Sequence, residues 1–444
     1  MKKEEKLGSG MMLQDTKGIE HIDYALTPKR HTPMYLMHKY WARKPHNVVG
    51  EYIKHYSKAN EVILDPFCGS GVTIAEALRY GRKAIGIDLD PVAAFITWMT
   101  IVPVDLKEFQ KTYDIITQEV KQQIESLYLT KCPKCKQETP FHFIVYEKEI
   151  PQKTHFRCPN CKLIFNKKFD EDDLAKAEEI RKMGIPFWYP ENELIWNSRV
   201  NIPKGMKVCD LFSKRNLIAL SILYHEIEKI TDDTLRDLMK FTFSSALPQA
   251  SKLLVYTEGQ GPGWKVRGFW IPEKRYEMNV WRFFDNRFKK TLEGKKESNL
   301  VVGKFVTQNN VQVYNQSATN LNNIPNETVD YVFTDPPYGD SIPYLELNYM
   351  YASWLKFRVD FDDEIIISDS PARRDRNFEM YSRLLARAFR EIYRVLKEGK
   401  WLTVTFHNTN IKIYNAIIQA AVLAALTLRK LFTSRPPKFL RRRS

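Results

Sequence analysis

The stretch from residue 61 to residue 87 constrains the fold most, because it has the pattern of strand, glycine turn, helix and strand. Residues 61–64 form an apolar run, residues 73–80 have helical spacing, and residues 83–87 form a second apolar run. Two strands joined by one helix are the unit of parallel sheets that helices cover. We therefore expect an α/β fold with a Rossmann-like, mostly parallel sheet and helices on both faces.

The turn inside this unit has the sequence Asp65-Pro66-Phe67-Cys68-Gly69-Ser70-Gly71. Its two glycines allow a ligand to approach the backbone closely. The dinucleotide fingerprint requires a third glycine, which is missing here, so NAD is not the expected ligand. Asp88 follows the second strand about twenty residues downstream, where an acid can hold two ribose hydroxyls. The pattern predicts a site for a nucleoside.

A second loop follows the apolar run 331–334 and has the sequence Asp335-Pro336-Pro337-Tyr338. Asp335 can accept a hydrogen bond from an exocyclic amine, and the Pro336 carbonyl can accept another. Tyr338 can stack on the face of a ring. The loop therefore favours binding of a flat, amine-bearing base; the alternative is a proline-rich turn after a core strand.

The two loops together resemble the signature motifs of the S-adenosylmethionine-dependent amino methyltransferases of DNA, which methylate adenine N6 or cytosine N4. The resemblance covers roughly residues 31–100 and 311–426. It implies a methyltransferase sheet, S-adenosylmethionine as cofactor and DNA as partner. The cofactor residues that we expect are Lys44, Pro45, Asp65, Phe67, Cys68, Gly69, Gly71, Asp88 and Ser317. The catalytic residues that we expect are Asp335, Pro336, Pro337 and Tyr338.

Two of these assignments have alternatives. Lys44 and Pro45 end the segment Tyr40-Trp41-Ala42-Arg43-Lys44-Pro45, which is similar to a Lys-Pro element that helps to bind the cofactor in the family. A basic helix start would also explain it. Ser317 stands where the family often has an acid that contacts the cofactor's adenine, so the adenine contact stays open.

Four cysteines form two Cys-x-x-Cys pairs, Cys132/Cys135 and Cys158/Cys161, with twenty-two residues between them. This spacing predicts a zinc ribbon with four thiolate ligands; the alternative is a pair of redox thiols. A site closed by four sulfurs is structural. The lysines and arginines around it either contact DNA or form a solvated charged face.

The chain has a formal net charge of +15 and a pI near 9.3. Such a charge favours a polyanionic partner, since phosphate contacts supply much of nucleic-acid affinity. The alternative is a basic protein without such a partner. Because neither a leader nor an apolar run of membrane length is visible, we expect a cytoplasmic location.

Residues 252–290 interleave aromatic and basic side chains. The aromatic residues are Tyr256, Trp264, Phe269, Trp270, Tyr276, Trp281, Phe283 and Phe284, and the basic residues are Lys265, Arg267, Lys274, Arg275, Arg282 and Arg287. Aromatic rings that can stack on bases, beside cations that can bind phosphates, predict a nucleic-acid-binding surface. The alternative is an aromatic core.

The expected organisation follows from these segments. It comprises a flexible tail (1–30), the cofactor half of the methyltransferase core (31–110), the zinc ribbon (131–168), a helical and aromatic/basic recognition region (169–300), the catalytic half (301–426) and a basic tail (427–444). Only one strand candidate remains for the antiparallel hairpin that closes such a sheet. We therefore expect a truncated or altered carboxyl end, with a nucleic-acid arm as the alternative.

The predicted reaction is direct in-line displacement, in which the amine of a flipped base attacks the sulfonium methyl while Asp335 and the Pro336 carbonyl orient it. Adenine N6 is favoured over cytosine N4. No Pro-Cys dipeptide occurs, which disfavours carbon-5 cytosine chemistry. The alternatives are a guanosine N2 methyltransferase of RNA and a catalytically impaired, zinc-containing nucleic-acid binder. A restriction endonuclease is an expected partner.

Overall fold

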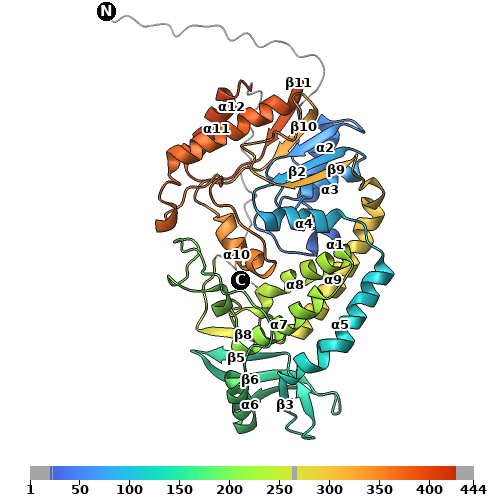
Figure 1. The fold of residues 1–444 in the computed structure, drawn as a ribbon, viewed down its shortest axis with the longest axis vertical. Coiled ribbons are helices and arrows are strands. Elements are labelled where there is room, and N and C mark those ends of the chain that lie inside the picture. Colours follow the sequence, from blue (N-terminus) through green and yellow to red (C-terminus); the bar gives the residue numbers. More distant parts are fainter. Residues whose placement is uncertain (1–20, 23, 263–267, 427–444) are drawn as a thin grey trace, which may run out of the picture.

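The central element is a parallel sheet, which lies at one end of an elongated molecule (Figure 1). The computed structural model describes residues 21–22, 24–262 and 268–426. The sheet order is β11 (Leu396–Val404), β10 (Val329–Thr334), β1 (Val62–Asp65), β2 (Lys83–Asp88) and β9 (Val311–Asn315), and every neighbouring pair is parallel. This confirms the predicted mostly parallel α/β sheet.

Helices cover both faces of this sheet because its strands carry apolar side chains on both sides. Ile63 and Tyr331 belong to one core, whereas Leu64 and Val332 belong to another, as the alternation of strand side chains requires. The first core contains α2 (His46–Tyr56), α3 (Val72–Arg79) and α4 (Pro91–Ile101). The second contains α11 (Phe378–Val395) and α12 (Ile411–Leu423). The chain therefore has the expected helical layers.

The strand order places β1 between β2 and β10, so the chain changes direction across the sheet at the β1/β10 pair. Loops after two such strands diverge and leave a crevice at their carboxyl ends, where open α/β sheets bind ligands. Asp65 ends β1 and Thr334 ends β10. The two predicted loops therefore begin side by side.

In the described residues the sheet has five strands, and none follows β11. The remaining strand candidate and the basic tail lie in residues 427–444, outside the described part of the chain.

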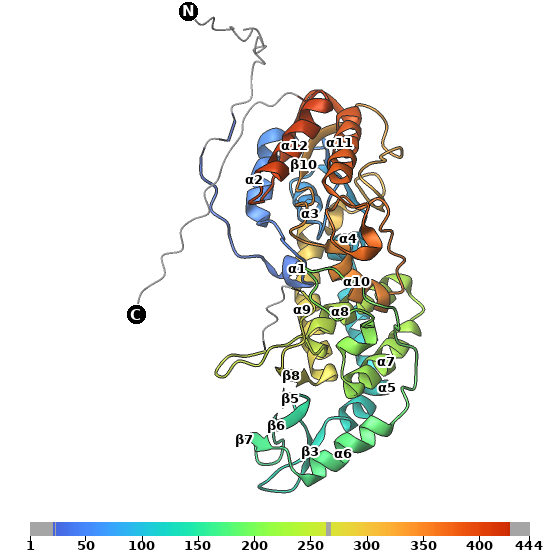
Figure 2. The same ribbon diagram turned by 90° about the vertical axis from the view of Figure 1, so that its left-hand side faces the viewer.

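A helical layer joins the parallel sheet to the far end of the molecule (Figures 1 and 2). It contains α5 (Leu106–Ser126), α7 (Lys214–Glu228), α8 (Asp233–Ala250) and α9 (Val280–Val301). Helix α9 packs against the short α1 (Pro33–Leu36), and α10 (Tyr344–Trp354) packs against α4 and α8. No helix in the described ranges has the length and apolar character that a bilayer crossing needs.

The far end carries an antiparallel sheet with the order β7 (Ile164–Lys168), β6 (Ile150–Arg157), β5 (Phe143–Glu147) and β8 (Lys274–Met278). A separate hairpin of β3 (Leu129–Lys131) and β4 (Glu138–Pro140) lies beside this sheet, and α6 (Glu171–Lys182) follows β7 in the chain. Strand β8 pairs with β5, so a strand from beyond residue 270 completes the sheet of the predicted ribbon.

The predicted aromatic surface of residues 252–290 is wrong for four of the seven predicted aromatic side chains that the structure describes. Phe269, Tyr276, Trp281 and Phe284 are at most 3% exposed and pack in the core. Tyr276 lies on β8, Trp281 and Phe284 lie on α9, and Phe269 precedes β8. Among the cations, Lys274 and Arg282 are exposed, whereas Arg275 and Arg287 are buried. Trp270 is 54% exposed, and Trp264, Lys265 and Arg267 lie outside the described residues.

Candidate active site

The loops after β1 and β10 open into one cleft, which has an empty volume of about 940 Å³, part of it open solvent. Gly69 from the first loop and Asp335 from the second both line it. The fold therefore brings together two loops that lie far apart in the sequence.

Asp65 connects the two loops. Its Oδ1 accepts a hydrogen bond of 2.8 Å from the Thr334 hydroxyl at the end of β10 and one of 3.1 Å from the Phe67 backbone. Burial raises the pKa of Asp65 to about 7. The carboxyl group therefore holds the turn against the neighbouring strand.

The glycine turn leaves no room for side chains. Gly69 and Gly71 have φ values of +53° and +75°, which favour glycine. A Cβ on Gly69 would lie 2.8 Å from the Tyr40 ring, and one on Gly71 would lie 2.7 Å from the Thr97 methyl group. The turn is thus a bare backbone cradle, closed on one side by Tyr40.

We expect Gly71→Ala to lower the free energy of unfolding by about 1–3 kcal/mol, because it combines left-handed backbone with a clash against the fully buried Thr97. Urea denaturation of the purified protein measures this. Gly184→Ala is the control, since no atom lies within 4 Å of its added Cβ and its backbone is unstrained. Equal stability of the two variants would contradict the strained turn.

Two carboxyl groups line the cleft beyond the turn. Asp88 accepts hydrogen bonds from the backbone amides of Gly69 at 2.8 Å and Asp90 at 3.0 Å, and burial raises its pKa to about 6. Asp90 caps α4 through the Val92 amide at 2.9 Å, and burial next to Asp88 raises its pKa to about 7. This acidic pair suits ribose hydroxyls and cationic groups.

Asp335 is held by three side chains. The Lys44 ammonium lies 2.6 Å from Oδ2, the Tyr338 hydroxyl donates to both carboxylate oxygens at 2.7 and 2.6 Å, and the Thr405 hydroxyl donates at 3.0 Å. Burial nevertheless raises the pKa of Asp335 above its ordinary value. The Tyr338 ring is 6% exposed and packs edge-on against Phe406, with centroids 5.2 Å apart.

The backbone of the Asp335 loop is fixed from behind. The Tyr381 hydroxyl donates to the Pro337 carbonyl at 2.9 Å, and the Asn408 amide donates to the Tyr338 carbonyl at 2.8 Å. Among the described residues no donor reaches the Pro336 carbonyl. Pro336 itself is buried and lies outside the lining of the cleft.

The segment before α2 bridges both loops. Arg43 is partly buried and donates to the Ser70 hydroxyl at 3.0 Å and to the backbone carbonyls of Tyr35 and His38. Lys44, the next residue, reaches the Asp335 carboxylate and the Tyr338 hydroxyl. Pro45 is the N-cap of α2.

The predicted site residues divide into two groups. Those that line the cleft are Lys44, Asp65, Phe67, Cys68, Gly69, Asp88, Ser317, Asp335 and Pro337. Pro45, Gly71, Pro336 and Tyr338 lie outside its lining. The sequence reasoning missed Asp90, Tyr344, Asp363 and Glu364, which also line the cleft, and Thr405 behind Asp335. Asp90 had a signal, since Asp before Pro91 is typical of a helix start.

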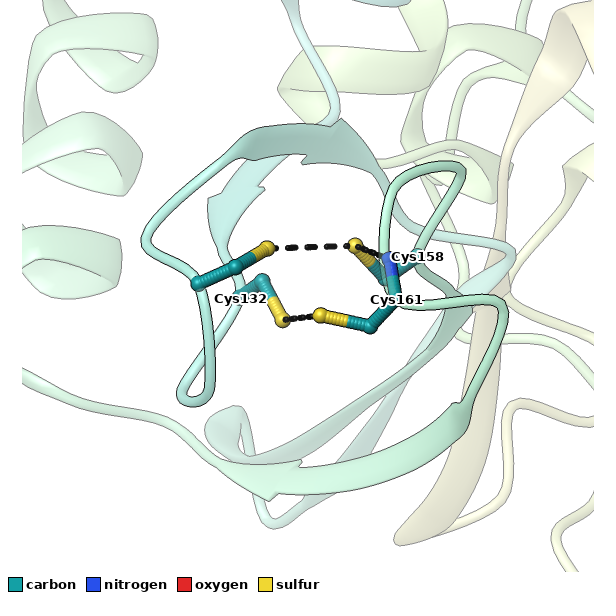
Figure 3. A group of neighbouring side chains, drawn as sticks. Cys132, Cys158 and Cys161 are labelled. Carbon is teal, nitrogen blue, oxygen red and sulfur yellow. Dashed lines mark hydrogen bonds between the residues drawn. The ribbon is translucent and has the colours of Figure 1, made fainter.

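The four paired cysteines gather at the far end of the molecule, where Figure 3 shows the sulfurs pointing toward one another. All four Sγ atoms lie within 4.8 Å of one another, with Cys132–Cys161 and Cys135–Cys158 separations of 3.9 and 3.6 Å. The two pairs have matching turns: the amides of Lys136 and Lys162 donate to the Cys132 and Cys158 carbonyls at 2.9 and 3.0 Å. Such a donor set fits a tetrahedral metal site.

Known proteins resemble the amino-terminal part of the chain. Residues 13–97 match the N6/N4 family described as DNA methylase. The type II methyltransferase M.MjaII of Methanocaldococcus jannaschii is 28% identical over 75 residues, which are 17% of this chain and 14% of that protein. The type II methyltransferase M2.LlaDCHI of Lactococcus lactis subsp. cremoris is 48% identical over 50 residues, 11% of this chain and 19% of that protein.

The aligned segments thus span less than one fifth of the length of each relative. The family match contains the glycine turn, Asp88 and Lys44, and it ends before Asp335. The matches therefore confirm the expected resemblance to DNA methylases of the N6/N4 type for residues 13–97, and the family match does not extend to the second loop.

Proposed function

We propose that the protein transfers a methyl group from S-adenosylmethionine to the exocyclic amine of a flipped DNA base, at adenine N6 in preference to cytosine N4. The observation that carries this proposal is that the bare glycine turn and Asp335 line one cleft. The DNA methylase match supports the DNA substrate.

The cleft has the chemistry that S-adenosylmethionine requires. Its carboxyl groups are Asp65, Asp88, Asp90, Asp335, Asp363 and Glu364, and the cations of its described lining are Arg43 and Lys44. Such an excess of acid favours a cationic ligand. When bound, S-adenosylmethionine supplies an electrophilic methyl group on a sulfonium. The Gly69 turn would hold it, and Asp88 would accept hydrogen bonds from ribose hydroxyls.

The residues of the second loop would position the base. Asp335 accepts a hydrogen bond from the exocyclic amine, and the Pro336 carbonyl accepts the other amine hydrogen. Both oxygens also stabilise the positive charge that develops on the amine nitrogen as it reacts. Most of the rate enhancement then comes from positioning two reactants in one water-poor cleft.

The target base has to leave the duplex to reach Asp335, because this carboxyl group is buried beside the sheet. A net charge of +15 supplies cations for the phosphates of the DNA. A restriction endonuclease is proposed as a partner, since both relatives are named type II methyltransferases.

We also propose that the four cysteines bind one structural zinc ion. Sulfurs at about 2.3 Å from a tetrahedral zinc are about 3.8 Å apart. The separations of 3.9 and 3.6 Å in the cluster agree with this value. Four sulfur ligands leave no open position for catalysis.

Nucleoside analysis tests the proposed reaction. The protein is incubated with methyl-labelled S-adenosylmethionine and either duplex DNA or transfer RNA, and the digested nucleosides are separated. We expect labelled N6-methyldeoxyadenosine from DNA. Label on N4-methyldeoxycytidine would show that the target base is cytosine, and label on guanosine of RNA would show that the substrate is RNA. No transfer to either nucleic acid would contradict the proposed function.

The binding of S-adenosylmethionine should depend on pH. Burial raises the pKa of Asp88 to about 6 and of Asp90 to about 7, so both carboxyl groups lose charge as the pH falls through this range. Because the ionised pair attracts a sulfonium, we expect affinity to rise roughly fivefold between about pH 5.5 and about pH 8. Calorimetric titration measures this. Asp90→Asn should flatten the profile, and a flat profile in the parent would contradict the role of the pair.

A further inference from the structure

The contact between Lys44 and Asp335 conflicts with the task proposed for Asp335. A carboxylate that receives an amine needs free lone pairs directed into the cleft. Here Oδ2 is 2.6 Å from the Lys44 ammonium and also accepts from the Tyr338 hydroxyl at 2.6 Å, while Oδ1 accepts from Tyr338 and Thr405. Lys44 therefore occupies the position of a cationic or amine-bearing ligand.

Lys44 is the cation of the cleft that is able to change partners. Arg43 is partly buried, and its guanidinium is fixed by the Ser70 hydroxyl and two backbone carbonyls. The Lys44 side chain is 27% exposed, and its partners are Asp335 and Tyr338 on one loop. A lysine carries three donors on a flexible stem, which suits a movable contact.

The position of Lys44 in the chain connects the two halves of the cleft. It follows directly after Arg43, which is bonded to Ser70 of the glycine turn, and it precedes Pro45 at the start of α2. The Lys44 side chain therefore starts beside the glycine turn, where we propose that the methyl donor binds, and its ammonium lies at the Asp335 loop, where we propose that the base binds.

S-adenosylmethionine carries a carboxylate, and the surrounding carboxyl groups repel it. A cation is the strongest partner for this group, and Lys44 is the cation of the described lining whose printed partners all belong to one loop. We propose that Lys44 is a positioning residue that exchanges partners: it neutralises Asp335 before the methyl donor binds, and it turns to the donor's carboxylate afterwards, which frees Asp335 for the base amine. This inference rests on the proposed function and implies that the donor binds before the base.

Two ligands isolate the exchange in a binding experiment. S-adenosylhomocysteine carries the amino acid carboxylate, whereas 5′-methylthioadenosine has the same nucleoside and sulfur but lacks the whole amino acid, both its carboxylate and its ammonium. Calorimetry gives the dissociation constant of each for the parent, Lys44→Met, Asp335→Asn and the double variant. Lys54→Met is the control, because Lys54 pairs with Glu51 on the surface of α2.

We expect Lys44→Met to raise the dissociation constant of S-adenosylhomocysteine about tenfold, since a charged contact is lost. Asp335→Asn should lower the dissociation constant of S-adenosylhomocysteine by about threefold, because Lys44 no longer has a competing partner. The double variant should bind it as weakly as Lys44→Met. The affinity for 5′-methylthioadenosine should stay within about twofold throughout, which also shows that the cleft is folded.

The exchange is overturned if Asp335→Asn leaves the affinity for S-adenosylhomocysteine unchanged or lowers it. It is also overturned if Lys44→Met weakens the binding of both ligands equally, because Lys44 would then stabilise the shape of the cleft without contacting the carboxylate. A parent protein that binds neither ligand would instead contradict the proposed function.

Discussion

Asp335→Asn is expected to lower kcat/KM for methyl transfer to DNA by about 10²–10³-fold, the usual cost of removing one preorganised group that stabilises transition-state charge. The asparagine has the same shape and keeps an oxygen for Thr405. It lacks the negative charge that orients the amine and stabilises it as it becomes positive. The measurement is initial-rate kinetics with labelled S-adenosylmethionine and duplex DNA.

The loss should not come from unfolding. The variant loses the ion pair with Lys44, yet it also removes a buried carboxylate whose raised pKa reports a cost of burial. These effects oppose each other, so we expect the free energy of unfolding to change by less than about 1 kcal/mol. Asp114→Asn on the exposed face of α5 is the control for activity. Parent-like kinetics for Asp335→Asn would remove this residue from the mechanism.

The strands that carry the site were predictable because each signal is local. The apolar run 331–334 has one plausible conformation, a strand that stops there, since the two prolines after Asp335 cannot continue a central strand. The glycine turn follows from the same logic, and β1, β2 and β10 all lie where the sequence predicted them. A parallel sheet then leaves few ways to arrange these strands, so the meeting of the two loops was also predictable.

The partners of Asp335 were not predictable because they depend on packing between distant segments. Lys44 reaches it from the amino-terminal segment, and Thr405 reaches it from the loop after β11. Likewise, Glu364 lines the cleft while Arg373 lies 2.5 Å from it and 2.8 Å from Glu346. Burial beside Glu346 raises the pKa of Glu364 to about 8. Nothing in the local sequence distinguishes such a buried acid from a surface one.

The aromatic segment 252–290 illustrates the opposite error. Alternating aromatic and basic residues are compatible with a nucleic-acid surface, but they are also the pattern of an amphipathic strand followed by an amphipathic helix. Tyr276 and Trp281 are each 3% exposed, which decides between the two. Burying a large aromatic side chain removes more apolar surface from water than burying any other type of side chain. The core alternative therefore had the stronger physical basis.

The second large effect is expected at the cysteine cluster. Cys158 is fully buried, and its sulfur lies 3.6 Å from that of Cys135. Cys158→Ser should remove one zinc ion per chain and lower the free energy of unfolding by about 4 kcal/mol or more, in the range that loss of a structural metal causes. Metal analysis by mass spectrometry and urea denaturation measure the two quantities.

The matched control is Cys209→Ser, because Cys209 is half-buried and lies outside the cluster. Its zinc content and stability should equal those of the parent. The loss in Cys158→Ser should be greatest near the cluster, because the cysteine turns lie between β3 and β4, which have three residues each, and between β6 and β7. Hydrogen exchange should therefore accelerate in residues 129–168 first, while β1 and β10 stay protected. A parent protein that is free of zinc as purified and unfolds like Cys158→Ser would contradict the metal site, because four thiols without an ion have no comparable means of holding these turns together.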